Sequence, residues 1–211
     1  MHGLGHVVVA YHGCDESTRD DLIAGRTKLR PSKNPYDWLG NGVYFFEGDW
    51  RRALKFATAS WDRPDEKLTR HPIIAPAVVG AVLRVGHWLD MSTQDGIDEF
   101  ARTYDAMVEE GIRLKPNKSA HREDGDALLR LLDRRVFNVL HRRRAEAGET
   151  AYDAVRGAFP QGRPVAPSSK IRRDSHVQIA LRNQACVLGY FRVDEAASFE
   201  VDVDLSMCAG R

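Results

Sequence analysis

The residues of this chain best suited to bind a ligand lie in two short sequence motifs about thirty residues apart. These motifs are Tyr11-His12-Gly13 and Gly42-Val43-Tyr44-Phe45-Phe46. Each belongs to an apolar run that predicts a strand, Val7–Tyr11 and Gly42–Phe46. Tyr44 offers a ring for stacking, and His12 offers a hydrogen-bond donor. Gly13 lacks a Cβ, so that a ligand can approach the backbone closely. Two such strands side by side would grip a flat heteroaromatic ligand.

Each of these residues also has a purely structural interpretation. A histidine at a strand end is often satisfied by the backbone, and a tyrosine beside two phenylalanines is often part of the core. Cys14 lies close to His12, but a cysteine after a strand is usually a small buried residue. The longer stretch Asp37-Trp38-Leu39-Gly40-Asn41-Gly42-Val43-Tyr44-Phe45-Phe46-Glu47, followed by Arg52-Ala53-Leu54, is much more specific.

This stretch and the His12-Gly13 pair resemble the ADP-ribosyltransferase superfamily, in its diphtheria-toxin and poly(ADP-ribose) polymerase branch. The resemblance covers mainly residues 7–57 and 165–193. It implies an α+β fold, a split β-sandwich with helical insertions, that binds NAD as co-substrate. It also implies that His12 contacts an adenosine-ribose hydroxyl, that the Gly13 backbone pairs with the nicotinamide carboxamide, and that Tyr44 stacks on nicotinamide.

The third position of the pattern departs from that branch. The resemblance places a catalytic Glu on a late strand, here Ser175–Leu181, and the inward slot holds Gln178. Glutamine can bond a ribose hydroxyl, but it cannot stabilise a developing cation by charge or act as a general base. Gln178 therefore argues against polymer elongation and leaves single transfer, in which positioning carries the rate. Glu47 and Asp174 are the nearest acids that could assist, and a solvent-facing Gln178 remains the structural alternative.

Two loops would serve the ligands under this resemblance. The segment from Lys28 to Asn34, with Ser32 and Asn34 as small polar contacts, would hold the NAD pyrophosphate. The loop from Pro160 to Asp174 would contact the acceptor. It carries Arg163, Lys170, Arg172 and Arg173, which suits an anionic acceptor such as RNA or DNA. A solvated loop is the alternative, and Arg142 to Arg144 admit the same two interpretations.

Composition restricts the protein class only loosely. The 211 residues fit a single domain, 1–211, with residues 95–150 as a helical insertion. A net charge of +1 argues against a strongly basic nucleic-acid binder. No apolar run approaches the length of a membrane span, and the N-terminus lacks the pattern of a signal peptide. Three cysteines without metal spacing favour a reducing cytoplasm and no metal.

Further elements are expected along the chain. Helices are predicted at Ser17–Ile23, from Asp49 to about Ser60, at Asp95–Glu110 and at Asp126–Ala147. Strands are predicted at Val78–Val85 and Trp88–Leu89, and at His176–Leu181 and Cys186–Val193 as a hairpin around Arg182-Asn183-Gln184. A Gly- and Pro-rich loop is expected over 157–170, and an edge strand over Val201–Leu205.

The sequence thus predicts a mono-ADP-ribosyltransferase that moves ADP-ribose from NAD to RNA, DNA or protein. By analogy with the superfamily it would be a toxin or phage-defence effector with a neutralising partner protein. Two alternatives stay open: an NAD glycohydrolase, in which water replaces the acceptor, and a catalytically silent module that binds NAD or ADP-ribose.

Overall fold

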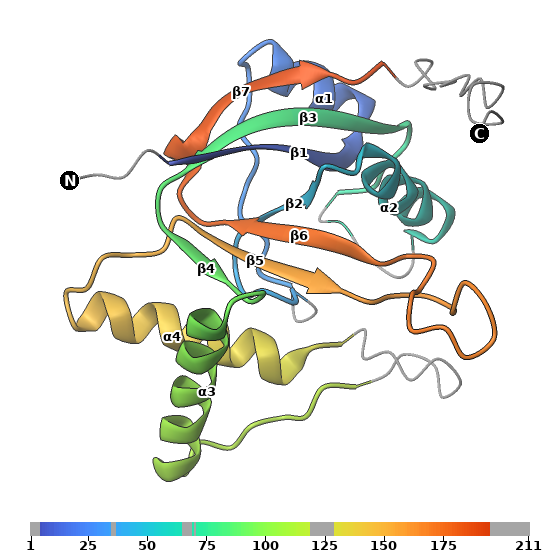
Figure 1. Cartoon of the computed structure of the whole chain (residues 1–211). Helices are drawn as coiled ribbons and strands as arrows, with labels where there is room; N and C mark the ends of the chain where they lie inside the picture. The colour runs from blue at the N-terminus through green and yellow to red at the C-terminus, as the bar shows by residue number, and fades with distance from the viewer. Residues whose placement is uncertain (1–4, 35–36, 65–68, 70, 119–128, 195–211) are drawn as a thin grey trace, which may run out of the picture.

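The protein is a mixed α and β structure built on one seven-stranded sheet (Figure 1). The computed structural model describes residues 5–34, 37–64, 69, 71–118 and 129–194. Its strands are β1 (His6–Asp15), β2 (Val43–Glu47), β3 (Pro76–Val85), β4 (Trp88–Asp90), β5 (Ala154–Phe159), β6 (His176–Leu181) and β7 (Val187–Arg192). Its α-helices are α1 (Glu16–Ile23), α2 (Trp50–Asp62), α3 (Gln94–Glu109) and α4 (Leu131–Glu146). Over these residues, no helix has both the length and the apolar composition that crossing a membrane requires.

The strands of the sheet, in the order β4-β5-β6-β2-β1-β3-β7, are joined unevenly. β1 pairs with β3 along its whole length, from His6↔Val85 to Asp15↔Pro76. In contrast, β1 and β2 share only two register pairs, Ala10↔Glu47 and Tyr11↔Phe46. The sheet therefore consists of two parts, β4-β5-β6-β2 and β1-β3-β7, that meet at one short junction.

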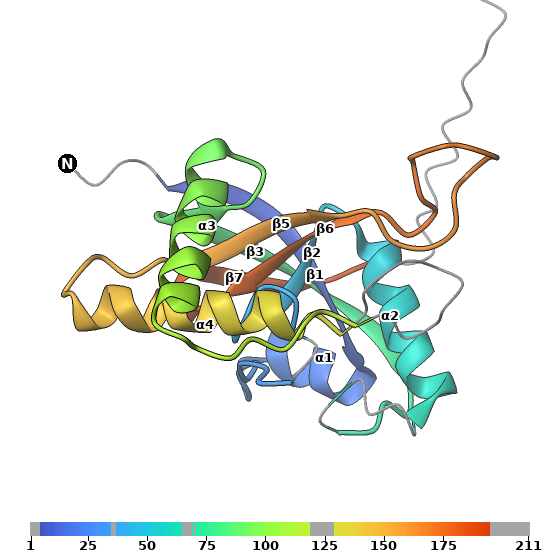
Figure 2. The ribbon, with the colours of Figure 1, turned by 90° about the horizontal axis from the view of Figure 1, so that it is seen from below.

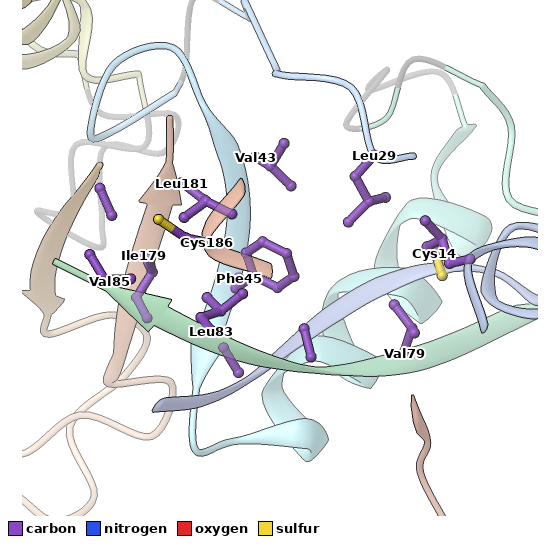
Figure 3. Packing of buried hydrophobic residues seen from close by; sticks show 14 residues of the cluster. Cys14, Leu29, Val43, Phe45, Val79, Leu83, Val85, Ile179, Leu181 and Cys186 are labelled. Carbon is purple, nitrogen blue, oxygen red and sulfur yellow. The ribbon is translucent and has the colours of Figure 1, made fainter. Parts of the chain in front are cut away.

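The two parts share one apolar core (Figure 3). Side chains alternate between the two faces of a strand, so that Val43 and Phe45 of β2 point to the same face. In the core they join Ile179 and Leu181 of β6 and Leu83 of β3. We call the face that lines this core the inner face. Phe45, Leu83 and Ile179 are completely buried.

Helices α2, α3 and α4 lie on the side of the outer face, whereas α1 adds Leu22 to the core on the inner face (Figure 2). α2 packs on the junction through Ala53, which clusters with Phe46 of β2 and Val78 of β3. α4 packs on the β4-β5-β6 part through Phe137 and Leu140, and α3 packs in turn on α4. The helix starts follow from side-chain caps: Asp49 accepts the Arg52 N–H before α2, and Thr93 accepts the Gly96 N–H before α3.

Most predicted elements are confirmed, but two predictions are wrong. Residues 157–159, expected in a loop, belong to β5, where the missing side chain of Gly157 leaves room for Leu39. The predicted hairpin does not form, because β6 pairs with β2 and β5 while β7 pairs with β3. The 3₁₀ turn Gln184–Cys186 carries the chain from one part of the sheet to the other.

The long helix of the insertion starts later than its apolar pattern predicted. α4 begins at Leu131, because Leu129 bridges to Lys118 in an extended conformation. Residues 126–128 of the predicted helix lie outside the described residues. So does the predicted strand Val201–Leu205.

We expect Gly13→Ala to destabilise the fold, because an added Cβ at this position would lie 2.2 Å from the Ala53 carbonyl oxygen of α2. Overpacking of this kind costs about 1–3 kcal/mol of unfolding free energy. Gly189→Ala in β7 is the matched control, since a Cβ there meets nothing within 4 Å. Urea denaturation compares the two variants, and equal stability would contradict this packing.

Candidate functional site

His12 lies one residue beyond the last pair that joins β1 to β2, and its side chain bridges the opening. The imidazole Nδ1 lies 2.7 Å from the Tyr44 carbonyl oxygen, which accepts a hydrogen bond from the Nδ1–H group. Burial lowers the pKa of His12, which keeps the ring neutral. This tautomer leaves Nε2 as a hydrogen-bond acceptor, as a contact from a ribose hydroxyl would require.

Tyr44 ties the preceding loop to the sheet. Its hydroxyl donates to the Gly40 carbonyl at 2.6 Å and accepts from the Leu39 N–H at 2.9 Å. Burial raises the pKa of this phenol well above its usual value, and the ring packs beside the cluster formed by Trp38, Leu39 and Ala180. Because the hydroxyl is used inside the protein, Tyr44 can offer a ligand only part of its ring.

Gln178 lies on the strand next to Tyr44. Tyr44 pairs with Ala180 and Phe46 pairs with Gln178, so that all four side chains occupy the outer face. Gln178 is half-buried, and none of the residues that the structure describes hydrogen-bonds to its amide group. That amide is therefore available to a ligand.

The structure brings Tyr44 and Gln178 together on one face but places the His12 side chain on the other. Even-numbered residues of β1 point to the inner core, as Ala10 and Cys14 do. Gly13 points to the outer face, where it contacts α2. His12 joins the group only through the Tyr44 carbonyl, at the edge between the two faces.

The two acids that could have assisted Gln178 are both engaged in ion pairs. Glu47 alternates to the inner face and pairs with Arg156, with the Arg156 Nε 2.7 Å from Glu47 Oε2. Asp174 pairs with Lys55 of α2. Cys14 offers no nucleophile either, because burial raises the pKa of its thiol to about 12.

Sequence reasoning missed His176, which lies two residues before Gln178 on the same face. Its ring lies among three aromatic rings, with centroids 5.1 Å from Phe46, 5.9 Å from Phe159 and 6.0 Å from Trp38. Its Nδ1–H donates to the Asp174 carbonyl at 2.7 Å, and its buried Nε2 has no partner in the described part of the chain. Burial lowers the pKa of His176 to about 4. Strand alternation around Gln178 was the signal that could have found it.

The loop proposed for the pyrophosphate is organised by its own side chains. Ser32 Oγ donates to Asp37 Oδ1 at 2.7 Å, and the Asn34 N–H donates to Ser32 Oγ at 3.4 Å. Burial raises the pKa of Asp37 to about 6. The Ser32 hydroxyl thus already serves the loop, and contact of Ser32 and Asn34 with a cofactor stays a prediction.

The loop before β6 is an ordered hairpin that projects beside this face (Figure 1). Val165 and Ile171 pair across it, and Arg173 bonds back to Arg163 through the main chain. Two contacts attach its base to α2: Arg52 Nη2 donates to Gln161 Oε1 at 2.7 Å, and Lys55 pairs with Asp174.

The cations of this hairpin differ from those of α4. Arg163, Lys170 and Arg173 are exposed. Three cations near the end of α4 instead pair with acids, Arg142 with Glu146, Arg143 with Glu110, and Arg144 with Glu99. The hairpin thus presents exposed cations on the segment that leads into β6 and Gln178.

Comparison with known proteins adds no relative. No protein-family model, curated protein or solved structure matches this chain. Over the described residues, no group of His, Cys, Asp or Glu side chains is arranged to hold a metal ion. A functional assignment therefore rests on the residues and contacts above.

We expect His176→Phe to reduce the loss of stability on acidification. Since the pKa of His176 is about 4 when folded and ordinarily 6.5, the unfolded chain binds a proton first as the pH falls. The free energy of unfolding therefore falls as the pH drops from 6.5 toward 4. Between pH 7 and pH 5 this fall amounts to about 2 kcal/mol.

Urea titrations at pH 7 and pH 5 measure this difference. The phenylalanine keeps the aromatic packing but loses the bond to Asp174, at a cost of about 1 kcal/mol at pH 7. His71→Gln, at an exposed histidine, should keep the wild-type pH dependence. A pH dependence in His176→Phe equal to that of the wild type would overturn this assignment.

Proposed function

We propose that this protein is a mono-ADP-ribosyltransferase that moves ADP-ribose from NAD to a macromolecular acceptor. The observation that supports this most is the register of β2 and β6, which makes Tyr44 and Gln178 diagonal neighbours on one face. Such neighbours lie about 7 Å apart, within the span of one nicotinamide riboside. The short β1–β2 junction also fits the split β-sandwich that the sequence resemblance implies.

In this proposal each residue has a defined role. The nicotinamide ring lies against Tyr44, and His12 Nε2, at the edge between the two faces, accepts a hydrogen bond from an adenosine-ribose hydroxyl. Gln178 orients the ribose hydroxyl next to the scissile bond between nicotinamide N1 and ribose C1′. Nicotinamide leaves with the bonding electron pair, and the acceptor nucleophile bonds C1′ and releases a proton.

The proton of the acceptor needs a destination other than Gln178. An amide cannot take it, and Glu47 is paired with Arg156 on the opposite face. The acceptor must therefore be intrinsically nucleophilic or bring its own base. If no such acceptor binds, water takes its place, and the protein acts as an NAD glycohydrolase.

The exposed cations of the hairpin favour an anionic acceptor. Arg163, Lys170 and Arg173 lie on a segment attached to α2 beside the Gln178 face. Clustered cations attract the phosphates of RNA or DNA, and we favour nucleic acid over protein as the acceptor. A cytoplasmic toxin or phage-defence effector with a neutralising partner is the biological role that fits this chemistry by analogy.

We expect Gln178→Ala to lower nicotinamide release from NAD on the order of 100-fold while weakening NAD binding much less. The reason is that the amide orients the ribose as the bond breaks, whereas most of the binding comes from other parts of NAD. Nicotinamide release is followed by chromatography, and NAD binding by calorimetry.

Gln94→Ala, at an exposed glutamine on α3, is the matched control and should match the wild type. Gln178→Ala should stay folded, because no described residue hydrogen-bonds to the Gln178 amide. A change in nicotinamide release can therefore be compared directly with the wild type. Unchanged release in Gln178→Ala would remove this residue from the reaction. A wild-type protein that binds NAD and leaves it intact would support the silent-module alternative.

A further inference from the structure

A cavity lies at the other end of β1, where this strand extends beyond its junction with β2. It has a volume of about 540 Å³, within the range of small-molecule sites. Val8 of β1, Glu47 of β2, Trp88 of β4 and Arg156 of β5 contribute to its wall. Val8 and His12 are four residues apart on the strand, about 13 Å, and none of the residues with a proposed role in NAD binding lines the cavity.

Acidic side chains dominate the charge of this cavity. Glu47, Asp90, Asp95 and Glu99 line it, against the single lining cation Arg156. Glu99 pairs with Arg144 at 2.9 Å. Asp95 is exposed and has no ion-pair partner among the residues that the structure describes.

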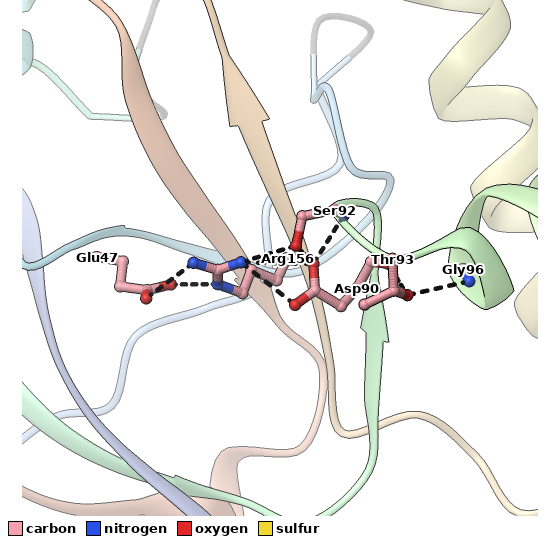
Figure 4. Close-up of polar contacts among 6 residues, drawn as sticks. All are labelled: Glu47, Asp90, Ser92, Thr93, Gly96 and Arg156. Carbon is pink, nitrogen blue, oxygen red and sulfur yellow. Dashed lines mark hydrogen bonds and ion pairs between the residues drawn. The ribbon is translucent and has the colours of Figure 1, made fainter.

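Four of the five N–H groups of Arg156 already bond to its neighbours (Figure 4). Its Nε and Nη2 donate to the two oxygens of Glu47, at 2.7 and 3.1 Å. Its Nη1 donates to Asp90 Oδ2 at 3.2 Å and to Ser92 Oγ at 3.2 Å. One cation between two carboxylates leaves a net negative charge, so an anionic ligand would meet repulsion and no free guanidinium.

The rest of the wall suits an organic cation better than a metal ion. Trp88 is only half-buried, and the half-buried Val8 adds apolar surface to the same wall. An indole face attracts ammonium and guanidinium groups, and apolar walls accommodate a hydrocarbon stem. In contrast, the acids here are not arranged as a metal site in the described chain.

We propose that this cavity binds an organic cation, an ammonium or guanidinium group on an apolar stem, with Trp88 as the aromatic wall and Asp95 as the unpaired counter-ion. Two sources share this chemistry: a free diamine or guanidine metabolite, and a lysine or arginine side chain of a partner protein. The proposal does not depend on the reaction with NAD.

Calorimetric titration of the full chain with agmatine, in the absence of NAD, tests this proposal. A capped tripeptide with a central arginine is the second probe. We expect saturable binding that weakens as salt is raised, because charge drives it. Tighter binding of agmatine would indicate a free metabolite, and tighter binding of the peptide would indicate a partner side chain.

Asp95→Asn removes the unpaired charge without breaking an internal contact, and should weaken binding about fivefold. Asp105→Asn makes the same change at an exposed position of the same helix, away from the cavity, and should leave binding unchanged. Failure of both probes to bind at millimolar concentration, or an equal effect of the two variants, would overturn the proposal. So would tighter binding of adipate, a dianion of similar length.

Discussion

The rest of the structure depends on the shortness of the pairing between β1 and β2. Among the described residues, the register pairs Ala10↔Glu47 and Tyr11↔Phe46 join the two parts of the sheet, and the Gly48 N–H donates to the Val9 carbonyl beside them. The parts can therefore fold over a common core. Where the ladder would continue, the strands separate, and a buried backbone carbonyl would lose its partner. The His12 side chain supplies that partner by donating to the Tyr44 carbonyl. The His12 imidazole thus supplies the hydrogen bond that further pairing of β1 with β2 would otherwise have made.

At this junction, successive side chains of a strand point to opposite faces of the sheet, and the two faces differ in their chemistry. Along β2, Tyr44 and Phe46 point outward, next to Gln178, while Phe45 and Glu47 point inward. The outer face is aromatic around Gln178, the Arg52 guanidinium lies 5.0 Å from the Phe46 ring centroid, and His176 is kept neutral there by burial. The inner end holds the acids that bind Arg156. The carboxylate nearest to Tyr44 in sequence is therefore unable to replace the charge that Gln178 lacks, and any chemistry on the outer face must rely on positioning.

Much of the fold could be predicted from local sequence signals. The apolar runs of β1, β2 and β6 and the Asp49 cap of α2 were readable because they depend on nearby residues. β5 was missed in part because Gly157 is typical of a loop, although here it makes room for Leu39. The wrong hairpin has another cause: adjacent strands in the sequence pair by default, and only the tertiary fold sends β7 to β3. Prediction of the site is limited in the same way. Tyr44 and Gln178 could be proposed from short sequence motifs, whereas the ion pair between Glu47 and Arg156 joins residues 109 positions apart.

We propose that the outer face cleaves NAD and passes ADP-ribose to a macromolecule. The most direct test uses NAD labelled in its adenylate half, incubated with the wild-type protein and a cell lysate, followed by separation of protein, RNA, DNA and small molecules. We expect label in the nucleic-acid fraction, in amounts that grow with the incubation time and the protein concentration. Label recovered only as free ADP-ribose, or only as intact NAD, would contradict it.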